Sequence, residues 1–198
     1  MLRCWYETKL QEVCREENSQ DPTRFTDRVM FASLMYFKRF FLRASLMEED
    51  PKHVMLAALL VAGKVEEERI EPDDLLPKYA KIKLETLLAL ELRMLEALSF
   101  QLVTISPFRA LQGFLQDLQS ECGGGMHDLQ QLHTLACDFI RRSLCADAPF
   151  LFTPQQLALA GLCEAGAHPS LAAGGVDVAS WLAKRFQLLG QADAAADG

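Results

Sequence analysis

The chain has 198 residues, and its 27 Asp and Glu outnumber its 20 Lys and Arg, which gives a formal net charge of -7. Half of the residues are hydrophobic, a share typical of a globular protein that buries a core without disulfides or metals. The acidic balance argues against broad, nonspecific nucleic-acid binding, which needs a surplus of cations to neutralise phosphates. The length allows one large domain or two of about 100 residues each.

The composition predicts an all-α protein, because Leu and Ala together number 57 whereas Val, Ile and Thr number only 19. The longest apolar run, Val54 to Ala62, is too short for a membrane span. The N-terminus carries no signal-peptide pattern, and no two of the six cysteines form a CxxC pair. We therefore expect an intracellular protein with cysteines in its core.

Apolar spacing predicts five helices in the first half of the chain. The third begins at Asp50 and Pro51, a helix cap followed by proline at the first helical position. Its body is apolar on all sides, so we expect neighbouring helices to surround it. The predicted ranges are 5–17, 25–44, 51–67, 72–80 and 82–98. In the last of these helices, the residues expected to face inward are Leu84, Leu87, Leu88, Leu92, Leu95 and Leu98.

The second half repeats this plan. Ser106 and Pro107 begin a helix that runs toward three glycines, and a second follows over residues 128–145. Thr153, Pro154 and Gln156 form a capping-box pattern at the start of a third, and a last helix is predicted over residues 181–189. The segment from Asp50 aligns with the segment from Thr153 at an offset of 103, which indicates an internal duplication and two small helical domains.

The sequence favours a protein without catalytic activity, since it contains no phosphate-binding loop, nucleophile elbow or zinc-protease motif. Cys122, His127, His133 and Cys137 lie close in sequence, but their spacing fits no common zinc pattern, and we predict neither metal nor cofactor.

Two charged residues stand among apolar neighbours: Lys64 near the end of the third helix and Glu91 in the fifth. They are either an internal ion pair or exposed edges, or else groups that bond to another protein's backbone. The basic groups that include Lys38, Arg39 and Arg43 are expected on solvated helix faces.

Three segments resemble a cyclin box: MYFKRFFL from Met35, DPKHVMLAALLVAGKVEE from Asp50 and ELRMLEALSFQL from Glu91. Within that family, SPFRALQGFLQDL from Ser106 and FLFTPQQLALAGL from Phe150 resemble the cyclin H subfamily, with cyclin C of the Mediator kinase module as the nearest competitor.

The resemblance implies a cyclin fold of two tandem five-helix repeats, the second of them incomplete. We expect an N-terminal box at 1–104, a truncated C-terminal repeat at 105–190 and a flexible tail at 191–198. The first helix reads CWYETKLQEV and lacks the MRAIL-type docking sequence of cell-cycle cyclins, so recruitment of RxL substrates is not expected.

In cyclins, a Lys at the end of the third helix and a Glu in the fifth contact the kinase backbone around its αC helix. The resemblance assigns these roles to Lys64 and Glu91. Further expected interface residues, chosen for their place beside Lys64, are Phe40, Phe41, Leu60 and Val61, with Glu67 at the rim. The alternative is that these residues belong to the core.

The resemblance implies a regulatory subunit that binds and activates a cyclin-dependent kinase, with a third assembly subunit and TFIIH as further partners and a nuclear location. It implies no direct contact with nucleic acid or membrane. Two alternatives from other classes remain: a TFIIB-like factor, which would need a basic DNA face, and a helical enzyme or ligand-binding protein.

Overall fold

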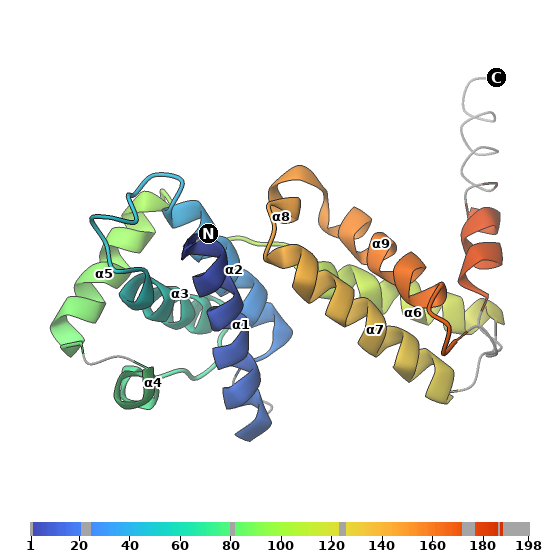
Figure 1. The fold of residues 1–198 in the computed structure, drawn as a ribbon, viewed down its shortest axis with the longest axis horizontal. Helices are drawn as coiled ribbons and strands as arrows, with labels where there is room; N and C mark the ends of the chain where they lie inside the picture. The colour runs from blue at the N-terminus through green and yellow to red at the C-terminus, as the bar shows by residue number, and fades with distance from the viewer. Residues whose placement is uncertain are drawn as a thin grey trace. The chain divides into compact units, whose positions relative to one another are not determined.

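The computed structural model describes residues 2–20, 25–79, 82–122, 126–171, 177–185 and 187. It divides into two compact units, Met1–Ser106 and Pro107–Gly198 (Figure 1). All regular structure in these described residues is helical, as the composition predicted. The predicted domain boundary falls at 104/105, two residues before this division, and the predicted tail at 191–198 lies outside the described residues.

The first unit contains five helices, in the order that the apolar spacing predicted. They are α1 (Leu2–Gln20), α2 (Asp27–Phe40), α3 (Pro51–Val65), α4 (Pro72–Tyr79) and α5 (Leu84–Ala97).

Helix α3 is the centre of this unit, as its apolar sequence predicted. Its start is confirmed, because the Asp50 side chain accepts a hydrogen bond of 2.9 Å from the backbone N–H of Lys52, and Pro51 stands in the first turn. The helix is buried from Val54 to Gly63, and it packs against α1, α2 and α5. Its apolar surface therefore forms the core around which the other helices assemble.

Helix α1 is attached to the core partly through a buried ion pair. The Lys38 ammonium lies 2.8 Å from the Glu7 carboxylate, and both side chains are 0% exposed. Arg3 lies 3.0 Å from the same carboxylate. The expectation of a solvated face at Lys38 was wrong, because α1 covers this side chain and gives it an anionic partner.

Two arginines, Arg39 of α2 and Arg43 in the turn after it, bind the segment that follows α5. Arg39 donates to the carbonyl of Gln101 at 2.8 Å, and Arg43 donates to the Ser99 hydroxyl at 2.8 Å. Tyr36 donates to the carbonyl of Leu102 at 2.5 Å. These bonds tie the segment after α5 to α2 and to the turn that follows α2, so Arg39 and Arg43 have structural roles that their expected place on a solvated face did not predict.

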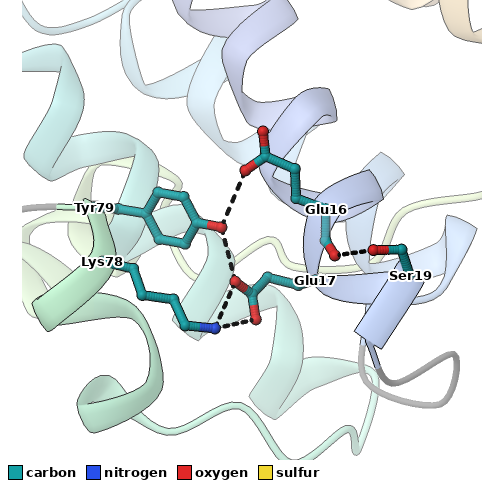
Figure 2. A network of polar contacts seen from close by, with 5 residues as sticks. All are labelled: Glu16, Glu17, Ser19, Lys78 and Tyr79. Carbon is teal, nitrogen blue, oxygen red and sulfur yellow. Dashed lines mark hydrogen bonds and ion pairs between the residues drawn. The ribbon is translucent and has the colours of Figure 1, made fainter.

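A second polar network joins α1 to α4 (Figure 2). The Glu17 carboxylate accepts two bonds of 2.9 Å from Lys78 and one of 2.7 Å from the Tyr79 hydroxyl. The hydroxyl also lies 3.4 Å from Glu16. Burial, and then its bonds to these carboxylates, raise the pKa of Tyr79. The network fixes α4 to α1.

The described part of the second unit includes three long helices and a short one: α6 (Pro107–Cys122), α7 (Met126–Leu144), α8 (Ala148–Leu151) and α9 (Pro154–Gly166). The predicted capping box is confirmed, with Thr153 and Gln156 bonding each other's backbone N–H groups. Helix α9 packs closely on α7, where a Cβ at Gly161 would lie 3.1 Å from the Ala136 carbonyl.

Residues 178–185 form a further helical segment that packs on α6 through Trp181 and on the end of α9, where Val178 lies against Gly166. The Trp181 indole N–H donates to Asp117 at 3.0 Å, and Arg185 pairs with the same carboxylate and with Glu121. The predicted helix at 181–189 therefore begins three residues earlier, and most of its last turn lies outside the described residues. Among the helices that the structure describes, none has the length and apolarity to cross a membrane.

Candidate partner-binding face

The structure brings Lys64 and Glu91 together on the surface of the first unit. The Lys64 ammonium lies 2.5 Å from one Glu91 carboxylate oxygen. The two side chains differ in access to solvent, since Lys64 is 61% exposed and Glu91 is 10% exposed. Lys64 therefore pairs with a nearly buried carboxylate while most of its own side chain is exposed to solvent.

The apolar side chains around Glu91 form an exposed stripe along α5. Leu88 and Leu92 lie within one turn of Glu91, and they are 44% and 55% exposed. Leu84, one turn before Leu88, is 43% exposed, and Val65 at the end of α3 is 37% exposed. We call the surface formed by Lys64, Val65, Leu84, Leu88, Glu91 and Leu92 the α3–α5 face.

This stripe corrects the predicted orientation of α5. The sequence reading placed Leu84, Leu88 and Leu92 inward, but the side chains that α5 buries are Leu87, Leu90, Glu91 and Met94, with Leu98 just beyond its end. A helix with leucines on every side has no polar face to fix its rotation, so the spacing alone could not select the buried side.

The end of α3 has a strained backbone beside this face. The N–H of Glu66 bonds to the carbonyl of Ala62, and the N–H of Glu68 bonds to that of Gly63 at 2.8 Å. The residue between them, Glu67, has a φ of 59°, a left-handed conformation in which glycine is preferred. Its side chain is exposed. A strained, exposed carboxylate at this point is consistent with a role outside the fold itself.

The loop after α3 is held firmly in place. The Thr26 hydroxyl donates to Glu68 at 2.5 Å, and the Thr26 N–H donates to the same carboxylate at 3.4 Å. Ile70 packs on Gly63, where a Cβ would lie 3.0 Å from the Ile70 side chain. On the other side, Glu49 pairs with Arg93 of α5. The Glu49–Arg93 pair and the packing of α5 on α3 fix these two helices relative to each other, so the α3–α5 face is preorganised.

Four other residues expected at the interface have a different environment. Phe40, Leu60 and Val61 are 2%, 1% and 2% exposed, because α2 and α3 pack them into the core. Phe41 is half-buried, with its ring 5.0 Å from that of Phe37 and 5.2 Å from that of Phe40. The core alternative that the sequence left open therefore describes Phe40, Leu60 and Val61.

The described residues hold no group of three or more His, Cys, Asp or Glu side chains arranged for a metal ion. His133 and Cys137 lie 3.4 Å apart on α7, at the spacing of one helical turn.

The fold, two helical units in tandem with an apolar third helix at the centre of the first, is that of a cyclin. A model of the cyclin N-terminal domain matches residues 10–103, and a model of the cyclin C-terminal domain matches residues 106–194. The chain belongs to the cyclin family.

Among its relatives, Cyclin-H1-1 of Arabidopsis thaliana is 33% identical over 164 residues, which are 81% of this chain and 47% of that protein. Cyclin-H of Xenopus laevis is 30% identical over 173 residues, 84% of this chain and 52% of that protein. The chain thus spans about half the length of the curated relatives that it matches.

Among solved structures, a chain of the yeast TFIIK (Kin28/Ccl1/Tfb3) complex superposes with a TM-score of 0.71 and 28% identity, covering 82% of this chain and 70% of that chain.

Proposed function

We propose that this chain is a regulatory cyclin of the cyclin H type, which binds and activates the catalytic subunit of a CDK-activating kinase. The observation that carries the proposal is the α3–α5 face, where an exposed ammonium and a nearly buried carboxylate lie among leucines. The similarity of the chain to cyclin H relatives and to a chain of the TFIIK complex supports a CDK-activating kinase as the partner.

The chemistry of the face suits a helix with its flanking backbone. The exposed leucines provide an apolar surface for a partner helix. The outward part of the Lys64 ammonium donates to a backbone carbonyl, and the second oxygen of Glu91 accepts from a backbone N–H. Glu67 adds negative charge at the rim, which suits a basic side chain of the partner.

Such a face activates a kinase by selecting one of its conformations. A protein kinase is competent only when a Lys on its third strand pairs with a Glu on its αC helix and its activation loop is ordered. The cyclin holds αC inward only to the extent that it binds the active conformation more tightly. A shift from about 1:99 to 99:1 needs roughly 5.5 kcal/mol of differential affinity.

We include in the proposal a third assembly subunit, participation in TFIIH and a nuclear location. The similarity to a subunit of a complex that has Kin28 and Tfb3 as its other components supports the first. Fluorescence imaging of the tagged protein tests the location, and exclusion from the nucleus would contradict it.

The test of the function is kinase activation in vitro. The chain is added to the purified kinase catalytic subunit of the same organism, and peptide phosphorylation is measured. We expect activation by the wild type and its loss in Leu92→Asp, which places a charge in the leucine stripe. Met47→Asp is the matched control, because Met47 is also an exposed apolar residue, 94% exposed, and lies outside this face.

Activation by Leu92→Asp at the wild-type level would contradict the assigned face. Failure of the wild type to bind any kinase subunit would contradict the proposed function itself.

A further inference from the structure

The internal duplication allows the same helix position to be compared in the two units. At the offset of 103, the outer positions Leu56, Ala57, Leu60 and Val61 of α3 correspond to Leu159, Ala160, Cys163 and Glu164 of α9. All four α3 side chains are 2% exposed or less, and α5 packs on this helix. In α9, Leu159 and Cys163 are half-buried, and Ala160 and Glu164 are exposed.

The difference arises from what packs on each helix. The inner positions of α9, which include Leu157 and Leu162, are buried against α6 and α7, as their counterparts in α3 are buried against α1 and α2. The described helical segment 178–185 meets α9 at its last residue, where a Cβ at Gly166 would lie 2.7 Å from the Val178 side chain, and the described residues place no long helix along the rest of α9. Among the described residues, the outer side of α9 is therefore open where the first repeat is covered.

An exposed apolar run leads into α9. Phe150, Leu151 and Phe152 immediately precede the α9 cap, in and after α8, and are 39%, 73% and 53% exposed. Helix α8 packs against α9. Consecutive large apolar residues on a surface are a recurrent sign of a binding site. We call Phe150, Leu151, Phe152, Leu159, Ala160, Cys163 and Glu164 the α9 outer face.

We propose that the α9 outer face binds an amphipathic helix of another polypeptide, which carries apolar residues at intervals of three and four and a basic residue opposite Glu164. We infer a helical partner because in the first repeat a helix, α5, packs on α3. Glu164 supplies the argument for charge, because it stands where the covered repeat has Val61.

Two other occupants fit the charge less well. A second copy of the chain, paired symmetrically through this face, would bring two Glu164 carboxylates together, because each subunit contributes the same surface. The residues of the chain after Arg185 contain two Asp and no Lys or Arg, so they offer no cation to Glu164.

Binding is tested by fluorescence anisotropy with the full chain and two labelled peptides. Both have the sequence of residues 84–98, the α5 segment, and the basic probe has its three Glu replaced by Lys. We expect the basic probe to bind more tightly than the unaltered one. Leu159→Asp and Ala160→Asp should each weaken its binding at least tenfold, and Glu164→Lys should remove its advantage over the unaltered probe.

Gln119→Asp, on an exposed position of α6, is the matched control and should leave binding unchanged. Ala160→Asp keeps the test valid if Leu159→Asp unfolds, because Ala160 is exposed and its replacement removes no core packing.

Four results would overturn the proposal: no binding of either probe, binding insensitive to both Asp variants, a concentration-dependent dimer that Ala160→Asp dissociates, or binding that appears only after residues 186–198 are deleted. The third identifies a second copy as the occupant, and the fourth identifies the chain's own end. Because the face belongs to the second unit, none of these results bears on the proposed kinase contact.

Discussion

Replacing Lys38 with Met should severely destabilise the first unit. The Glu7 carboxylate lies 2.8 Å from the Lys38 ammonium, and both side chains are 0% exposed. Met fills a similar volume but leaves the buried carboxylate with Arg3, which is 26% exposed, in place of its buried partner. Removing one member of a buried ion pair costs about 3–5 kcal/mol of unfolding free energy. That is a large part of the roughly 5–15 kcal/mol that stabilises a typical domain.

The chain offers a convenient assay, because its two tryptophans lie in different units, Trp5 in the first and Trp181 in the second. Urea unfolding in a Trp181→Phe background is followed by Trp5 fluorescence, with circular dichroism as a second probe. Lys9→Met is the matched control, because Lys9 pairs with Glu12 at 3.0 Å on the exposed side of α1, the helix that carries Glu7. An exposed pair of this kind contributes about 0–1 kcal/mol.

The double variant Glu7→Leu with Lys38→Met separates the charge effect from packing. It removes both charges, so we expect it to recover most of the loss, because a well-packed apolar pair is often as stable as a buried ion pair. A loss below about 1 kcal/mol in Lys38→Met would refute the reasoning, since an orphaned buried charge costs more than that. A double variant as unstable as the single one would refute it too.

Two further predictions concern backbone strain and pH. Glu67→Gly should raise the urea midpoint by the equivalent of about 1 kcal/mol, because glycine adopts the left-handed conformation at φ 59° without strain, and an unchanged or lower midpoint would contradict this. Burial, with a smaller contribution from the charge of Glu66, raises the pKa of Tyr36 to about 12. Its stabilising contribution is complete below the unfolded pKa of about 10 and is lost as the pH rises toward 12. Tyr36→Phe should therefore make the urea midpoint fall less steeply between these pH values, and an equally steep fall would exclude Tyr36 as the cause.

The order of the helices and several of their starts could be predicted from the sequence because the signals are local. Asp50 followed by Pro51, and Thr153 with Gln156, determine caps through bonds to residues two or three positions away. The duplication was also visible, because it preserves both an apolar pattern and its proline.

The long-range polar contacts were not predictable, because they join residues that are far apart in the chain. Lys38 reads as a solvated residue of a basic cluster until α1 places Glu7 beside it. Phe40 and Leu60 read equally well as core or as surface, and only the packing of α2 on α3 decides between these. On α5, leucines occur on every side of the helix and do not indicate which side is buried. The exposed stripe that includes Leu88 and Leu92 could therefore be identified only from the structure.

The equilibrium dissociation constant of the chain for its kinase catalytic subunit, measured by isothermal titration calorimetry, tests the central claim most directly. The informative variant is Lys64→Ala with Glu91→Ala, because removing both charges leaves no unpaired carboxylate in the fold. Its matched control is Lys9→Ala with Glu12→Ala, an exposed ion pair on α1. We predict that the first variant keeps the wild-type unfolding temperature and binds at least ~30-fold more weakly, the equivalent of about 2 kcal/mol expected for a binding hot spot. The control should bind as the wild type does, and wild-type affinity in the Lys64 and Glu91 variant would contradict the proposed interface.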